Sequence, residues 1–131
     1  MKMHTFKVTA SIAGLLAVII AAGLCTVSFL RSSSEKLENH ITVMESNIAS
    51  GHWEKAGEEL SSLEQLWDRT QKKWTVLLDH SEIDSIDTSL SRLSNFIASK
   101  SQPLSLGETA VLRQYIRHIP EKESFTLKNV F

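Results

Sequence analysis

The sequence predicts an all-α protein, in which an N-terminal transmembrane helix is followed by a small antiparallel bundle of about four helices. Two observations predict this class. Residues 8–30 carry no charged side chain. After them, apolar residues recur every three or four positions in separate stretches, which is the period of one helix face. We therefore divide the chain into a cytoplasmic N-terminus (1–7), a transmembrane helix (8–30) and an extracytoplasmic helical domain (31–131).

The apolar segment is long enough to cross a bilayer. As a helix, residues 8–30 rise about 34 Å, compared with a hydrocarbon thickness of about 30 Å. Lys2 and Lys7 precede the segment, whereas the basic residues after it are interleaved with acidic ones. The positive-inside bias therefore predicts a single-pass protein of the cell membrane, with its N-terminus in the cytoplasm and its domain outside.

A cleavable signal peptide is the alternative to this signal-anchor. The small residues Ala21-Ala22-Gly23 could be cleaved, but the apolar run continues to Leu30, whereas the apolar core of a signal peptide is usually shorter. A lipoprotein is disfavoured because the bulky Leu24 precedes Cys25. The anchor could also pair two copies into a homodimer through small residues spaced by four, although membrane helices are generally rich in such residues. Those residues are Ala13, Ala17 and Ala21.

Charge and cysteine content exclude several classes of partner and site. The formal net charge is −1, and no Lys/Arg cluster forms the basic face that a nucleic-acid binder needs, so nucleic acid is not expected. The single cysteine, Cys25, lies in the apolar segment, so the domain can form neither a disulfide nor a thiolate metal site. We expect no cofactor and a fold that depends on packing.

Two stripes predict the first half of the bundle. The first comprises Leu37, Ile41, Met44 and Ile48, and Ser50-Gly51 ends its helix. Its start stays open, because Ser32 and Glu35 have the spacing of a capping box but the membrane helix could also run on through them. The second stripe comprises Trp53, Ala56, Leu60, Leu63, Trp67, Thr70, Trp74 and Leu77. Tryptophans are too large for the holes of a two-stranded coiled coil, so we favour bundle core over a coiled coil or an indole-lined ligand groove.

Two further helices are expected. Asp79 or Ser81 is expected to cap a third helix whose apolar stripe is Ile83, Ile86, Leu90, Leu93 and Ile97. A fourth helix is expected to open at Leu104, with Ser105 and Glu108 as its capping box. Its apolar side is Leu112, Tyr115, Ile116 and Ile119. Pro120 is expected to end it, and the tail 121–131 to dock on the bundle.

Polar residues are expected to gather at the pole of the bundle nearest the membrane, because each helix reverses the direction of the one before it. They are Trp74, Asp79, His80, Glu82, Asp84, His118 and Glu121. Two histidines with carboxylates could bind a divalent cation, or sense pH because imidazole protonates near pH 6.5. The alternative is that these residues only cap and solvate helix ends, and no HExxH-like spacing is present.

No catalytic constellation appears in the sequence. It has neither a Gly-x-Ser-x-Gly elbow nor a glycine-rich phosphate loop, and the pair Glu58-Glu59 lies on a solvated helix face. We therefore do not expect an enzyme. The leading hypothesis is a binding or scaffold module for another envelope or membrane protein. The alternative is a small-ligand, metal or pH sensor that uses the membrane-proximal pole.

Several short motifs together resemble one protein family. They are Gly51-His52-Trp53, His80–Ile86, Leu90–Leu93, His118–Glu121 and Leu127–Asn129. Over about residues 34–131 the chain is similar to the domain-of-unknown-function family 4363, which comprises small bacterial membrane-anchored proteins. The resemblance implies a bacterial envelope location and adds Arg92 to the candidate residues. It implies no activity, cofactor or substrate.

Overall fold

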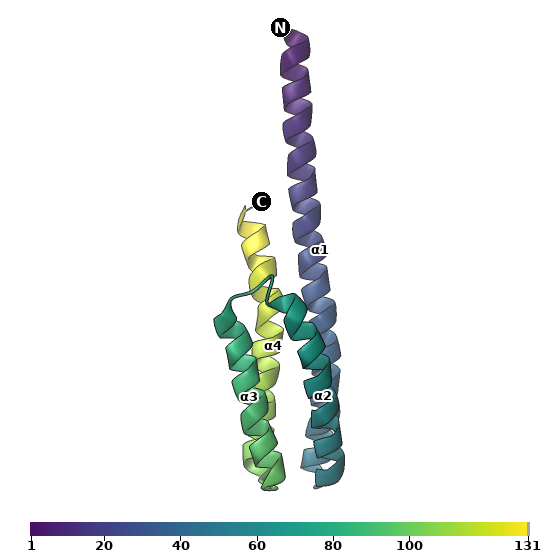
Figure 1. The fold of residues 1–131 in the computed structure, drawn as a ribbon, viewed down its shortest axis with the longest axis vertical. Coiled ribbons are helices and arrows are strands. Elements are labelled where there is room, and N and C mark those ends of the chain that lie inside the picture. The colour runs from purple at the N-terminus through teal and green to yellow at the C-terminus, as the bar shows by residue number, and fades with distance from the viewer. Residues whose placement is uncertain (131) are drawn as a thin grey trace.

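The computed structural model describes residues 1–130, and these form four α-helices and no strand. The helices are α1 (Lys2–Ala49), α2 (Trp53–Trp74), α3 (His80–Ala98) and α4 (Gln102–Val130). They run up and down as antiparallel neighbours (Figure 1). α1 packs on α2 and α4, and α4 packs on α3, whereas α2 and α3 are the least closely packed neighbours. The all-α class and the antiparallel bundle are confirmed.

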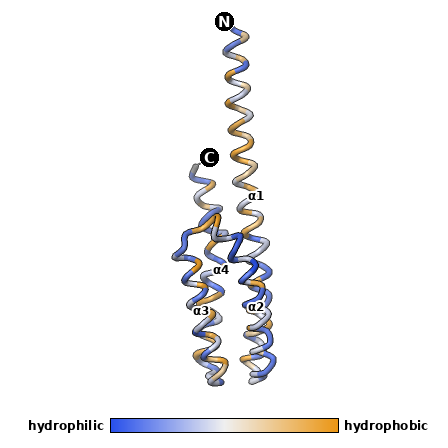
Figure 2. The backbone as a smooth tube through the Cα atoms, viewed as in Figure 1, coloured by the Kyte–Doolittle hydropathy of each residue, from blue (hydrophilic) through white to orange (hydrophobic). Residues whose placement is uncertain are grey.

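The N-terminal part of α1 projects beyond the bundle (Figure 1), and it is the most continuously apolar part of the chain (Figure 2). This stretch is long and apolar enough to cross a membrane, and none of it is buried inside the protein. α1 runs unbroken through Ser32 and Glu35, so no capping box starts a new helix there. Leu30 and Ser34 are already buried in the bundle. One helix therefore joins the apolar stretch to the core.

The bundle core contains most of the apolar stripes that the sequence predicts, although Tyr115, predicted on the apolar side of the fourth helix, is exposed. Trp67 and Trp74 are both buried, and their rings meet edge to face with centroids 5.5 Å apart. Such aromatic pairs stabilise a core beyond the area that they bury. α2 ends at Trp74, so Leu77 lies past the helix and is exposed rather than part of the seam.

The start of α4 differs from the sequence prediction. The helix begins at Gln102, and Ser105 and Glu108 are buried side chains rather than a capping box. Glu108 accepts a hydrogen bond from Ser89 Oγ of α3 at 2.7 Å. Gln102 Nε2 donates to the carbonyls of Ile48 and Ala49 at 3.1 and 2.9 Å. The start of α4 thus satisfies carbonyls that the end of α1 leaves without helical partners.

Pro120 does not end α4, which was the clearest error of the sequence prediction. Proline has no N–H, so it cannot donate to the carbonyl of Ile116 four residues earlier. Ser34 Oγ of α1 donates to this carbonyl instead, at 3.1 Å, and the Ser34 side chain is buried. The neighbouring helix therefore supplies a hydrogen bond in place of the one that the proline removes.

Beyond Pro120, the last turns of α4 run beside α1. A Cβ on Gly23 would lie 2.7 Å from Leu127 Cδ1, so the glycine gives the leucine room to approach α1. The prediction that the tail docks is supported at this contact, although Phe125 stays 67 % exposed. Phe131 and the side chain of Val130, which were part of that prediction, lie outside the described residues.

Replacing Ser34 with alanine should lower the free energy of unfolding by about 1–3 kcal/mol, because the buried Ile116 carbonyl loses this donor. Chemical denaturation of the full chain in detergent micelles measures this loss. In a Pro120→Ala background the amide of residue 120 can donate to the same carbonyl, so Ser34→Ala should cost clearly less. Equal costs in the two backgrounds would show that the two residues are independent and contradict this account.

Candidate functional site

The pole that the sequence predicts near the membrane holds one ion pair. Lys122 Nζ of α4 lies 2.8 Å from Glu82 Oε1 of α3. The hydrogen bond and charge of Glu82 raise the pKa of Lys122, with smaller contributions from Asp79 and Glu123. Trp74 is buried in the core beneath this pole. The sequence did not predict Lys122 as a residue of this pole, because its partner Glu82 lies on another helix and spacing along the chain does not reveal the pair.

The other predicted residues of this pole do not converge in the structure. His80, Asp84, His118 and Glu121 are exposed, and their own side chains form no hydrogen bond or ion pair with another described residue. Within residues 1–130, no group of three His, Cys, Asp or Glu side chains lies close enough together to hold a metal ion.

Arg92, which the family resemblance added, lies on the interface between α3 and α4. Its Nη1 is 3.8 Å from Glu108 Oε1, the same carboxylate oxygen that accepts the hydrogen bond of Ser89. The arginine side chain is itself largely exposed. Arg92 therefore lies where its charge can balance the nearly buried carboxylate of Glu108, and it is not part of the predicted pole.

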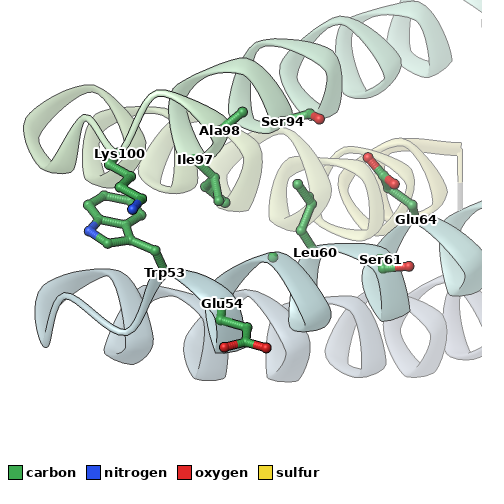
Figure 3. Close-up of a pocket in the computed structure, with 10 residues that line it drawn as sticks. Trp53, Glu54, Leu60, Ser61, Glu64, Ser94, Ile97, Ala98 and Lys100 are labelled. Atoms are coloured by element: carbon green, nitrogen blue, oxygen red, sulfur yellow. The ribbon is translucent and has the colours of Figure 1, made fainter.

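A groove lies between α2 and α3. It consists of two hollows of about 520 and 420 Å³, which share Glu64 and Ser94. Leu60 and Ile97 lie between the helices, and the Lys100 side chain reaches toward the indole of Trp53 at the membrane-distal end (Figure 3). The remaining lining residues are Glu54, Gly57, Ser61, Trp67, Asp68, Asp87, Leu90, Ser91, Asn95 and Ala98.

Asp87 of α3 crosses the membrane-proximal end of this groove. Trp67 Nε1 donates to its Oδ1 at 2.6 Å, and Gln71 Nε2 donates to its Oδ2 at 3.0 Å. Both carboxylate oxygens are therefore held by α2. Between this bridge and the Trp53 end of the groove, no side-chain hydrogen bond joins α2 to α3 among the described residues. The groove stays open there.

The groove is acidic. Four carboxylates, Glu54, Glu64, Asp68 and Asp87, line it, against the single cation Lys100. Burial raises the pKa of Glu64 above its usual value of 4.5, and the neighbouring charge of Asp68 adds to the effect. A bound cationic group would relieve this repulsion, so the groove favours a positively charged ligand with an apolar side.

A pattern of small and acidic residues in the sequence marks this groove, but it lies beside the apolar core stripe and was not recognised. Gly57, Ser61 and Glu64 recur at intervals of four and three beside the apolar seam of α2, and Ser94 and Ala98 do the same on α3. Small side chains facing each other leave space between two helices. A second stripe of small and acidic residues therefore marks the groove.

Replacing Asp87 with alanine should destabilise the domain by about 1–2 kcal/mol, because the buried Trp67 N–H loses its acceptor. Chemical denaturation followed by tryptophan fluorescence measures this change. Asp84→Ala is the matched control: Asp84 is exposed on the same helix, and its loss should change stability by less than about 0.5 kcal/mol. Equal effects of the two substitutions would contradict the bridging role of Asp87.

Stability should also depend on pH through Glu64. Because its folded-state pKa is raised, its contribution to stability is fully present below the usual value of 4.5 and is lost as pH rises through the folded-state pKa. Glu64→Gln should therefore stabilise the domain at pH 7, by up to about 0.5 kcal/mol because the group is largely solvated, and give no such gain near pH 3.

Denaturation midpoints at the two pH values test this expectation. Glu58→Gln, on the exposed side of α2, controls for the loss of one carboxylate. If Glu64→Gln lowers stability at pH 7 and Glu58→Gln does not, the ionised Glu64 carboxylate stabilises the fold and the expectation is wrong.

Comparison with known proteins places the chain in one family. No curated protein and no solved structure matches it. A family model described as "Domain of unknown function (DUF4363)" matches residues 24–130, which include all of α2, α3 and α4. The match confirms the resemblance seen in the short motifs and extends it from Ser34 back to Leu24. The chain therefore belongs to the domain-of-unknown-function family 4363.

Proposed function

We propose that this protein is a membrane-tethered, non-enzymatic binding module whose α2–α3 groove takes a cationic helical segment of another membrane or envelope protein. The observation that carries the proposal is the groove itself, which combines apolar walls with four carboxylates and one lysine. In this account α1 spans the membrane with its N-terminus in the cytoplasm and holds the bundle outside, in a bacterial envelope.

The shape of the groove favours a segment of a protein over a small molecule. Small-molecule sites generally enclose most of their ligand, whereas the hollow between Trp53 and Glu64 is open to solvent. An amphipathic helix can lay its apolar face between two helices and leave its polar sides in water. The partly exposed indole of Trp53 supplies apolar contact for such a helix, above a floor formed by the nearly buried Leu60 and Ile97.

The charge of the groove selects the partner. Glu54 and Glu64 of α2 flank its membrane-distal part, and Asp68 and Asp87 its membrane-proximal part. Complementary charge mainly speeds association and rejects like-charged competitors. Lysine or arginine on the polar sides of the bound helix would meet these carboxylates.

The tether supports the same proposal. A membrane anchor confines the domain to a thin layer, which raises its effective concentration toward partners held in the same membrane. A groove of modest area can then act with modest intrinsic affinity. The sensor alternative has less support, because neither His80 nor His118 lines this groove. Neither histidine belongs to a group of three possible metal ligands among the described residues.

Site-specific photocrosslinking in native membranes tests the proposal. A photoreactive residue at Ser61 or Ser94 lies in the groove, whereas one at Gln114 lies on the exposed side of α4 and serves as the control. We expect the same adduct from both groove positions and none from the control. The crosslinked peptide should be cationic and amphipathic, and raised salt should lower the yield because it screens exposed charges.

Charge reversal sharpens the test. Glu64→Lys with Asp68→Lys should abolish the adduct while the protein remains in the membrane fraction and keeps its helical circular dichroism. An adduct that survives this reversal, or one that forms equally at Gln114, would contradict a charge-selective groove. Replacing His80 and His118 together with glutamine should leave the adduct unchanged, and its loss would favour the sensor alternative instead.

A further inference from the structure

The connection between α2 and α3 exposes apolar side chains at the pole where α1 leaves the bundle. Val76 is 83 % exposed and Leu77 is 41 % exposed. Figure 1 shows this connection on the side of the bundle toward which the N-terminal part of α1 projects, and Figure 2 shows apolar colour there. A tight connection between two helices usually carries polar residues, so this pair is unexpected in water.

The end of α4 adds a third apolar side chain on the same side of the bundle. Phe125 is 67 % exposed, whereas Leu127, two residues later and so on nearly the opposite face of the helix, lies against Gly23 of α1. Phe29 of α1 is also partly exposed, and Lys73 Nζ lies 5.9 Å from the centre of its ring. Exposed apolar side chains from three separate elements therefore flank the base of the apolar stretch.

The end of α4 also limits how far hydrocarbon can reach along α1. Glu123 and Thr126 line the same hollow as Gly23 and Val27. If hydrocarbon covered residues 8–30 in full, these polar groups would lie within it, where charged side chains are strongly disfavoured. A boundary near Gly23 places Glu123 and Thr126 outside the hydrocarbon and leaves Lys128, one residue past Leu127, at its edge.

A boundary at this level still leaves enough helix to cross the bilayer. A helix over residues 3–22 rises about 30 Å, which is the hydrocarbon thickness. Lys7 can extend its ammonium group to the opposite interface along its apolar stem.

We propose that Val76, Leu77 and Phe125 insert into the interfacial zone of the bilayer that α1 crosses, and that hydrocarbon ends near Gly23 rather than at Leu30. This second membrane contact rests on the tether of the proposed function but not on its groove. Continuity with α1 identifies the occupant as lipid, because α1 carries the patch to the membrane surface. Apolar insertion drives the contact, since the charges around it, such as Lys72 and Asp79, are of both signs.

The contact would fix the orientation of the bundle. One transmembrane helix alone allows a domain to tilt and rotate about it. Insertion of a loop and of the end of α4 beside α1 adds points of attachment to the same surface. The end of the α2–α3 groove that holds Trp53 and Lys100 would then lie at the pole farther from the membrane.

Fluorescence of the full chain in vesicles of phosphatidylcholine tests this proposal. The variant Cys25→Ser removes the native thiol, and single cysteines at Val76, Leu77 or Phe125 then take an environment-sensitive dye. Leu16 is the control for the spanning helix, and Val43, which is exposed on the membrane-distal half of α1, is the control for water. Iodide quenches dye that is exposed to the buffer, and spin-labelled lipids quench dye that lies in the bilayer.

We expect dye at the three patch positions to be quenched by lipid near the headgroups and to be several-fold less accessible to iodide than dye at Val43. Equal iodide access at the patch and at Val43, with Leu16 still shielded, would overturn the second contact and leave the tether intact. Iodide access at Leu16 as well would overturn the tether and this proposal together. The vesicles contain no other protein, so a patch that is covered only by a protein partner would also read as exposed and count against lipid.

Discussion

The hydrogen bond from Ser34 to the Ile116 carbonyl is the interaction on which the relation between α1 and α4 depends. It supplies the carbonyl that Pro120 leaves without an amide donor, and so lets α4 continue toward Gly23 beside α1. The flanking ion pairs between these helices involve partly solvated side chains, and such pairs contribute little to stability. A buried polar bond between the two longest helices instead fixes their register.

This pairing explains why the opposite side of the bundle is open. α1 and α4 bind each other closely, and each of them holds one of the two shorter helices. Among the described residues, the side-chain hydrogen bonds between α2 and α3 are the two that Asp87 accepts from Trp67 and Gln71. Away from this bridge, small residues face one another and carboxylates repel, so a groove remains. The groove between α2 and α3 therefore remains because the pairs α1–α2, α1–α4 and α3–α4 provide most of the packing between helices.

Periodicity in the sequence predicted the helices and most of the core, because one apolar stripe reports directly on one buried face. It failed where a polar group finds its partner on a distant part of the chain. Pro120 signalled a helix end, but Ser34, which lies 82 positions before Ile116, supplies the missing bond. Glu108 had the spacing of a cap, but Ser89 and Arg92 of α3 draw it into the interface. The groove was missed for a related reason, since the gap between two helices depends on both of them.

The central claim is that α1 is one uninterrupted helix that joins the apolar stretch to the bundle core. Hydrogen exchange of backbone amides, measured on the full chain in lipid nanodiscs, tests this claim most directly. The account predicts slow exchange without a break from the apolar stretch through Ser34 to Ile48, because these amides are bonded within one helix and partly buried. Fast exchange confined to residues 31–35 would show a flexible hinge and contradict it.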